Sequence, residues 1–345
     1  MMHMQDLNIM LSQMPFPAFL VLDGKICLVN QAAAQRTAEV GCPVLDILVT
    51  GQEEYLAFTQ GSLSLRVQFS GTQYTCYVTQ LHNYQLFTME SDTANQELNA
   101  LALASTQLYL PLSEITLILD RLSGNSEDKS KITKNLQRLQ RTVRNMADAG
   151  QFVSASPKMA TCEMRMLLKE VFDKVSDALS KAGVTLRYTL PRLPVFTQAD
   201  SQMIKRAVYN LISNAVKFAS EDKTVDICVR ATDRCLYIAV ANANVAEPLP
   251  GGIFHRYSRQ PGLEPQPYGL GLGMTFIQAA AAAHGGTVLV QNNEQAGLTV
   301  TMSLAINKAK DNQLKSPVLI PDLYGGADQM LIELSDILPY QLYND

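Results

Sequence analysis

The chain has 345 residues, a length that predicts two or three domains rather than one. Hydrophobic residues make up 47% and charged residues 17%, and the formal net charge is −4, from 28 Lys and Arg against 32 Asp and Glu. This balance is typical of a soluble globular protein and argues against disorder and against bulk nucleic-acid binding. No apolar run reaches the ~18 residues of a membrane span, and residues 1–13 lack the features of a signal peptide. We therefore expect a cytoplasmic protein.

The cysteines contain no CxxC pair, so neither a zinc site nor a redox dithiol has sequence support. We expect reduced, mostly buried thiols. The six residues are Cys27, Cys42, Cys76, Cys162, Cys228 and Cys235.

Residues 1–90 are predicted to form a small α+β domain. Five short runs are typical of strands, and a helical stretch at residues 31–40 follows the second run. The runs are AFLVLD, KICLVN, LSLRVQF, YTCYVTQL and YQLFTM. The opening, PFPAFLVLDGKICLVNQAAAQ, resembles the start of a PAS sensor domain and implies a sensing role. A mixed domain without a ligand is an equal alternative, because fold alone does not give function.

Residues 91–157 are predicted to form a polar linker and a two-helix hairpin. Each helix carries an apolar seam with 4-3 spacing, and the loop SGNSEDKS separates the two. The seams are Leu101, Ser105, Leu108, Leu112, Ile115, Leu119 and Leu122, then Ile132, Leu136, Leu139, Val143, Met146, Gly150 and Val153. Two such hairpins would bury their seams in a four-helix bundle, so we expect a homodimer. The alternative is that the hairpin packs on its flanking domains.

Two charged features have no assigned role. Opposite the second seam, four basic residues form either a solvated face or a docking surface for an acidic partner. They are Lys131, Lys134, Arg138 and Arg141. The tail, residues 307–345, has no Lys or Arg after Lys315 and carries Asp322, Asp328, Glu333, Asp336 and Asp345. Its apolar residues Met330, Leu331, Leu334, Ile337 and Leu338 predict a short amphipathic helix. We expect this helix to pack on the protein's own surface rather than to act as a docking peptide.

Residues 158–306 are predicted to form an α/β sandwich, with helices on one face of a mixed sheet. Residues 162–182 and 201–218 have helical apolar spacing. VDICVRA and CLYIAVAN predict a hairpin around residues 232–234, and TVLVQN and LTVTMSLAI predict two closing strands.

The strongest chemical signal is NLISNAVKF, inside the second of these helices. Asn210, Asn214 and Lys217 fall at i, i+4 and i+7, which places two amides and one ammonium on one helical face. Buried asparagines on an apolar helix need partners, because an unsatisfied amide is costly. Oxygen ligands for Mg²⁺ and a cation for phosphate would supply the reason. A polar cap on a surface face would explain one asparagine but not all three residues.

A glycine-rich loop precedes the next predicted helix. YGLGLGMTFIQ places Gly269, Gly271 and Gly273 just before a helix that ends at residues 284–286. Such glycines let backbone N–H groups approach a phosphate, and the helix dipole adds favourable potential. Neither a Walker A motif nor the HRD and DFG motifs of protein kinases are present, so those folds are excluded as the source of the loop.

Together these residues resemble the catalytic ATP-binding domain of sensor histidine kinases, whose fold is shared with Hsp90 and gyrase. The resemblance matches an N box, led in by an acidic residue, an F box (IFHRYSR, residues 253–259) and a second glycine box. The matching positions are Asp200, Asn210, Asn214, Lys217, Arg259, Gly269, Gly271 and Gly273. PAS domain, dimerising hairpin and ATPase-like domain follow in this order in such proteins, so the resemblance covers about residues 12–306. It implies ATP as cofactor, Mg²⁺ held by Asn214, and a response regulator or other signalling protein as partner.

The chain departs from the family at the adenine-binding position. Where the family has an Asp followed by a Gly-x-Gly pair, this chain reads Asn242-Ala243-Asn244-Val245-Ala246. An amide both donates and accepts, so adenine recognition could survive in altered form. We expect adenine binding to be weaker than in the family.

The second departure lies at the phosphoacceptor. In STQLYLPL, residues 105–112, Thr106 stands where the family has its histidine and Gln107 replaces the acidic neighbour. The four histidines of the chain, His3, His82, His255 and His284, all lie outside the hairpin. The sequence therefore predicts a cytoplasmic, dimeric, degenerate histidine kinase homologue in two-component signalling, a pseudokinase that binds ATP and Mg²⁺ weakly or conditionally. The alternatives are a non-catalytic signalling scaffold and a kinase that phosphorylates another protein in trans.

Overall fold

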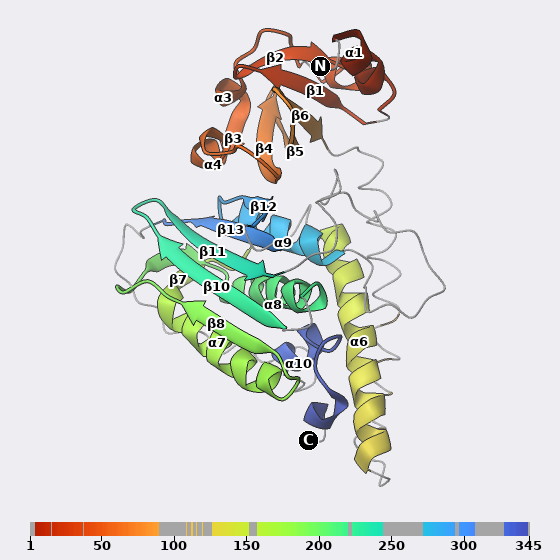
Figure 1. The fold of residues 1–345 in the computed structure, drawn as a ribbon, viewed down its shortest axis with the longest axis vertical. Coiled ribbons are helices and arrows are strands. Elements are labelled where there is room, and N and C mark those ends of the chain that lie inside the picture. Colours follow the sequence, from red (N-terminus) through yellow and green to blue (C-terminus); the bar gives the residue numbers. More distant parts are fainter. Residues whose placement is uncertain are drawn as a thin grey trace.

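The computed structural model describes residues 4–14, 16–36, 38–89, 108, 112, 115, 119, 126–151, 157–219, 223–243, 272–293, 297–307 and 328–343. It has two α/β units joined at a sheet edge, with the long helix α6 (Ser126–Gln151) beside the C-terminal unit (Figure 1). None of the described helices is both long enough and apolar enough to span a membrane.

The N-terminal unit contributes six antiparallel strands, five in the order β2-β1-β6-β5-β4 and β3 paired to β4. All five predicted strands of residues 1–90 are confirmed. The elements are α1 (Met4–Ser12), β1 (Ala18–Leu22), β2 (Lys25–Val29), α2 (Gln31–Ala34), α3 (Val44–Ile47), β3 (Leu48–Thr50), α4 (Gln52–Leu56), β4 (Ser62–Phe69), β5 (Thr72–Leu81) and β6 (Tyr84–Met89). Stacked Phe19 and Phe87 lie at the centre of its core.

The predicted helix over residues 31–40 is wrong beyond its first turn, because α2 ends at Ala34. The chain then turns back to β2, where the Gly41 N–H donates to the Ile26 carbonyl and the Ile26 N–H donates to the Cys42 carbonyl. Gly41 has φ 92°, a conformation that glycine adopts without strain. These sheet-edge bonds take the place of a continued helix.

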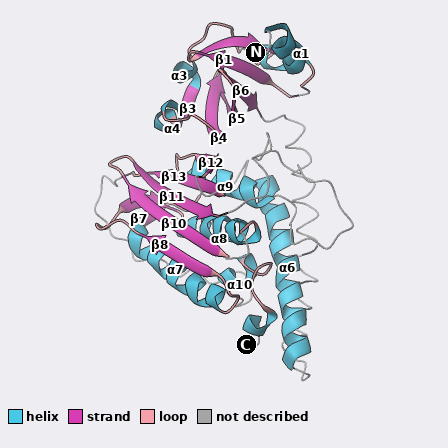
Figure 2. Ribbon diagram, in the orientation of Figure 1, coloured by secondary structure: helices cyan, strands magenta, loops and turns pink. Residues whose placement is uncertain are grey.

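The C-terminal unit has the predicted sandwich architecture. Strands β12-β13-β11-β10-β8 form a mixed sheet in which only the β10–β8 pair is parallel among the described strands, and α7, α8 and α9 cover one face (Figure 2). The elements are β7 (Ala160–Glu163), α7 (Met164–Ser180), β8 (Thr185–Thr189), β9 (Phe196–Ala199), α8 (Ser201–Lys217), β10 (Thr224–Ala231), β11 (Cys235–Asn242), α9 (Leu272–Ala283), β12 (Val288–Asn292) and β13 (Leu298–Ala305).

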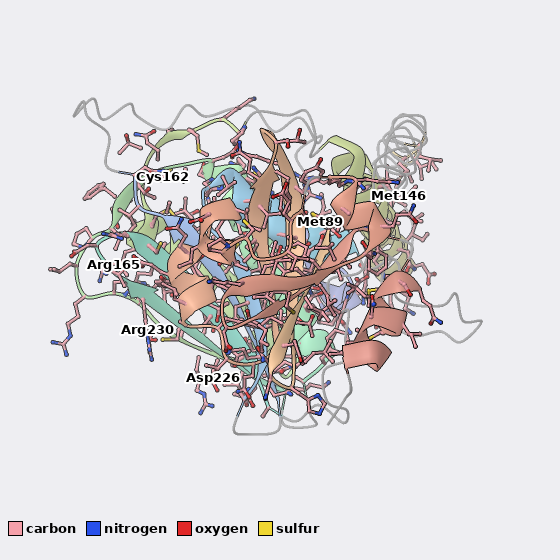
Figure 3. The ribbon with its side chains drawn as sticks, turned by 90° about the horizontal axis from the view of Figure 1, so that it is seen from above. Met89, Met146, Cys162, Arg165, Asp226 and Arg230 are labelled. Carbon is pink, nitrogen blue, oxygen red and sulfur yellow. The ribbon has the colours of Figure 1, made fainter. Side chains whose placement is uncertain are left out.

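Alternation along the strands explains this packing. In β11 every second residue is buried, so Leu236, Ile238 and Val240 face the helices while their neighbours face away. Figure 3, seen from above, shows the N-terminal unit over this layer, with Asp226 and Arg230 of β10 at one side.

The tail packs on the protein's own surface, as expected. Helix α10 (Gln329–Glu333) and the 3₁₀ helix η1 (Tyr340–Tyr343) lie against α6, and α10 also contacts α8. The α-helix is shorter than the predicted amphipathic segment, because the chain continues as turns after Leu334. Met330, Leu334 and Leu338 are nevertheless buried.

The two sheets are continuous. Strand β4 pairs with β12 in antiparallel register from Ser62 opposite Val290 to Ser64 opposite Val288. Gly61 precedes this contact with φ 94°, and a Cβ there would lie 2.1 Å from the Val290 carbonyl oxygen. Only glycine therefore permits this approach without movement of the backbone.

The expectation that the cysteines are mostly buried is wrong. All six are free thiols, but Cys76 alone is fully buried and the other five are partly exposed. Several occupy positions on the open side of their strands, where alternation places every second residue.

His284 closes the C-terminal end of α9 in its neutral form. Its Nε2 accepts from the Asp200 N–H at 2.9 Å, and its Nδ1 lies 2.7 Å from the Ala280 carbonyl oxygen, to which it donates. Burial lowers the pKa of the ring, and the bond to Ala280 only partly opposes this effect. The unfolded chain thus takes up a proton that the folded chain resists.

Stability should therefore fall as the pH drops below about 6.5, the ordinary pKa of histidine, with a limit of ~1.4 kcal/mol per pH unit. Urea unfolding at neutral and mildly acidic pH measures the loss. His284→Gln lacks this titration and should lose less stability over the same interval; equal losses in the two proteins would contradict the assignment.

Candidate nucleotide site

Helix α8 begins at a side-chain cap. Oδ1 of Asp200 accepts from the backbone N–H groups of Gln202 and Met203, both at 3.1 Å, and Oδ2 accepts from the Lys158 N–H at 2.9 Å. Such a cap satisfies the free donors of the first turn. Asp200 therefore fixes where the helix starts and, with it, where the later polar residues point.

Three of the predicted site residues come together where α8 passes the start of α9. A Cβ on Gly273 would lie 3.0 Å from Oδ1 of Asn210 and 3.9 Å from Oδ1 of Asn214. Gly273 thus lets the beginning of α9 approach the amides of α8 closely. Asn210 is fully buried, whereas Asn214 and Lys217 keep partial exposure.

The buried Asn210 amide is held by charged groups of the chain itself. Its Nδ2 donates to Oε2 of Glu333 at 3.2 Å and to the Arg206 carbonyl at 3.0 Å, and its Oδ1 accepts from Nη2 of Arg141 at 3.2 Å. The polar partners predicted for Asn210 therefore include Glu333 of the tail and Arg141 of α6.

Glu333 is the centre of a buried ionic cluster. Its side chain is 0% exposed, and its Oε1 lies 2.6 Å from Nε of Arg206. Arg141 and Arg144 of α6 approach the same carboxylate at 3.6 and 3.8 Å. The Arg206 guanidinium also stacks over the Phe276 ring of α9, with its centre 4.3 Å from the ring centroid. Helices α6 and α8 thus meet the tail at one carboxylate, and α9 packs against Arg206 of the same cluster.

Asp336 binds Lys217, the residue predicted to supply a cation for phosphate. Its Oδ2 lies 2.5 Å from Nζ of Lys217 and 2.6 Å from Nη1 of Arg141, and its Oδ1 accepts from Nε of Arg138 at 3.0 Å. Burial opposes ionisation, but the charges of Lys217 and Arg141 outweigh it and hold the pKa of this carboxyl below its ordinary value. Its ion pairs are therefore complete above the ordinary Asp range and weaken only as the pH falls below it.

These contacts answer the question left open about the basic residues of the second hairpin helix. Arg138 and Arg141 bind the chain's own acidic tail. Lys131 pairs with Glu127 and lies over the Tyr340 ring, 5.1 Å from its centroid. The face opposite the seam is thus a docking surface within the same chain.

The sequence pattern does not indicate a role for Arg206 or a link between the tail and this site. One signal for it is present in the sequence: an arginine one turn before Asn210 on a mainly apolar helix indicates a buried cation that needs an acidic partner. Its partner, Glu333, lies 127 residues further along the chain, so local spacing could not identify it.

Asn242 is positioned differently from an adenine-reading residue. It is buried at the end of β11, where its Nδ2 donates to the Ala215 carbonyl at 3.1 Å and its Oδ1 accepts from the Leu298 N–H at 3.0 Å. Ala215 carries one of the last four carbonyls of α8, which lack partners within the helix. Asn242 therefore closes the C-terminal end of α8 and ties it to β13.

The remaining candidates lie outside the described residues. These are Thr106 and Gln107 at the phosphoacceptor position, Arg259 of the F box, and Gly269 and Gly271 of the glycine box.

Comparison with known proteins identifies the fold around this site. Residues 199–308 match the family model described as histidine kinase-, DNA gyrase B- and HSP90-like ATPase. Over 182 residues the chain is 34% identical to histidine protein kinase DivJ of Caulobacter vibrioides, which covers 52% of this chain and 27% of DivJ. Residues 199–308 therefore belong to the ATPase family that histidine kinases share with DNA gyrase B and HSP90.

Another histidine kinase relative shares a longer region. The sensor-like histidine kinase SenX3 of Mycobacterium tuberculosis is 24% identical over 264 residues, or 71% of this chain and 64% of SenX3. The crystal structure of full-length ShkA in complex with AMPPNP superposes with a TM-score of 0.48 at 22% identity, over 61% of this chain and 46% of ShkA. The chain thus spans between about a quarter and two thirds of the length of the two curated relatives.

Replacing Asn242 by the aspartate typical of the histidine kinase family should destabilise this protein. Asn242→Asp removes the donor to Ala215 and places a carboxylate at the negative end of the α8 dipole. We expect a loss of about 1–3 kcal/mol in the free energy of unfolding, measured with urea. Asn8→Asp, on an exposed position of α1, supplies the same change of charge as a control. A variant at position 242 as stable as wild type would mean that the amide does not cap α8.

Proposed function

We propose that this chain is a signalling protein of the two-component type that binds Mg²⁺-nucleotide weakly or conditionally and does not form phosphohistidine on its hairpin. The observation that carries the proposal is the state of α8. Asn210 and Lys217, at the N-box positions of the family, are bonded to Glu333 and Asp336. A nucleotide has to share or displace these carboxylates, and either route weakens its binding.

The magnesium and phosphate half of the proposed site retains its residue types. Asn214 supplies an amide oxygen, the kind of hard ligand that Mg²⁺ prefers, beside the close approach of Gly273. Lys217 supplies a cation for phosphate oxygens. In this proposal Arg259, Gly269 and Gly271 complete the phosphate contacts from the preceding loop.

The adenine half of the proposed site is weaker. Asn242 uses one amide hydrogen and one oxygen lone pair on the backbone, which leaves one of each for a ligand. Its burial at the end of β11 also limits the access of a base. Asn242 should therefore contribute less selectivity for adenine than an exposed aspartate would.

The absence of phosphohistidine follows from the residues at the acceptor position. Thr106 has a hydroxyl that is a poor nucleophile without a base, and Gln107 is an amide without basicity at neutral pH. His284 does not substitute for the missing acceptor, because both of its ring nitrogens bond to the backbone.

A homodimer through the hairpin is part of this proposal. Leu136 and Val143 of the second seam are buried within the chain, whereas Ile132 and Leu139 are about half exposed, as are Leu108 and Ile115 of the first seam. These exposed seam residues are available to a second copy, and light scattering at micromolar concentration tests the assembly. A response regulator or another signalling protein is the proposed downstream partner.

Calorimetric titration with ATP, with and without Mg²⁺, tests nucleotide binding. We expect weak binding that requires Mg²⁺ and that falls by tenfold or more in Asn214→Ala, since roughly 1.4 kcal/mol of ligand energy corresponds to tenfold. Asn292→Ala, at an exposed position of β12, is the matched control and should bind as wild type does. Tight binding that is unchanged in Asn214→Ala would place the site elsewhere.

Incubation with radiolabelled Mg²⁺-ATP tests phosphoryl transfer. We expect no acid-labile label on residues 98–154, because transfer to nitrogen needs a positioned imidazole. Acid-labile label in that region would refute this part of the proposal. Acid-stable label that disappears in Thr106→Ala would instead favour a kinase that modifies a hydroxyl over a non-catalytic scaffold.

A further inference from the structure

The described part of the tail contains a compact docked segment. Asp328 caps α10 through the Met330 N–H at 3.0 Å and pairs with Lys174 of α7 at 2.6 Å. The Tyr343 hydroxyl donates to the Leu331 carbonyl at 3.0 Å, which closes the segment on itself. Together with the buried Glu333 side chain, these bonds define one specific docked arrangement for residues 328–343.

We propose that this segment, residues 328–343, is an intramolecular latch that competes with Mg²⁺-nucleotide for α8. The inference rests on the proposed function, because it concerns the regulation of the same site. Glu333 takes the Asn210 amide and Asp336 takes the Lys217 ammonium. Both carboxylates occupy positions that would otherwise serve anionic oxygens of a nucleotide.

The nucleotide and the latch compete for the same donors, Asn210 and Lys217, and their negative charges oppose simultaneous binding. A nucleoside triphosphate brings several negative charges to the part of α8 where the carboxylates of Glu333 and Asp336 already lie. Like charges a few ångströms apart in a partly buried site repel strongly, because the surroundings screen them less than water does. Binding of the nucleotide therefore favours release of the latch.

Release of the latch also changes the attachment of α6. Asp336 bridges Lys217 of α8 to Arg138 and Arg141 of α6. The Tyr340 hydroxyl donates to Glu127 at the start of α6 at 3.0 Å. Arg141 also bonds directly to Asn210 and Ser213 of α8, so release of the latch loosens the attachment of the proposed dimerisation helix to α8 without abolishing it. The latch thus couples the occupancy of the site to the hairpin.

Substitutions at Asp336 in the full chain test the competition. Asp336→Asn weakens the contact with Lys217 and Arg141, and Asp336→Lys reverses the charge and should open the latch. We expect Mg²⁺-ATP to bind about tenfold more tightly to Asp336→Lys than to wild type, with Asp336→Asn between them, a coupling of ordinary allosteric size. Circular dichroism establishes that each variant is folded.

Asp226 provides matched controls. It forms a two-pronged pair with Arg187 on the sheet, and Figure 3 shows it well apart from Met146 of α6. Asp226→Asn and Asp226→Lys make the same changes of charge away from α8, so their affinity for Mg²⁺-ATP should equal that of wild type.

Hydrogen exchange in the wild-type chain provides a second measurement. The N–H groups of Ile332, Leu334 and Leu338 are bonded within the docked segment. By thermodynamic reciprocity, saturating Mg²⁺-ATP should accelerate their exchange.

The outcomes separate the latch from the proposed function. Equal affinity in wild type and both Asp336 variants, with unchanged exchange, would overturn the latch and leave nucleotide binding intact. Failure of every protein to bind Mg²⁺-ATP, Asp336→Lys included, would overturn the proposed nucleotide site and the latch with it. Tighter binding in the Asp336 variants alone, with faster exchange, is the expected result.

Discussion

The buried carboxylate of Glu333 determines how the C-terminal half of the molecule is assembled. A carboxylate removed from water is stable only where cations and donors surround it, and here Arg206 comes from α8 and Arg141 and Arg144 from α6. Removing one of these arginines would leave the buried carboxylate with less compensation. Helix α6, helix α8 and the tail are consequently held together by a requirement for charge balance as well as by apolar packing.

Helix α8 can carry this cluster because both of its ends are fixed by side chains. Asp200 caps its first turn, and Asn242 bonds to the Ala215 carbonyl near its last turn. Between these points, ten residues of the helix are buried. Asn210, Asn214 and Lys217 therefore project from a helix that is fixed along its whole length. The tail and α6 supply the partners of Asn210 and Lys217.

Local patterns in the sequence predict the strands and the main helices, because alternation and helical spacing directly reflect which residues are buried. They also predict that Asn210 needs polar partners. The partners themselves could not be predicted, since Glu333 and Arg141 lie far from it in sequence and are brought near it only by the fold. The pattern of residues 31–40 predicts too much helix for a related reason: sheet-edge bonds to Ile26 override the local preference.

The short pairing between β4 and β12 has a consequence for the stability of the separate units. Strand β12 has β13 on one side and β4 on the other, so the N-terminal unit covers an edge of the C-terminal sheet. A fragment beginning at residue 157 would expose the unpaired backbone groups of β12 to water and to other strands. Such an edge is a template for intermolecular pairing. By covering β12, the N-terminal unit therefore protects the C-terminal sheet from aggregation.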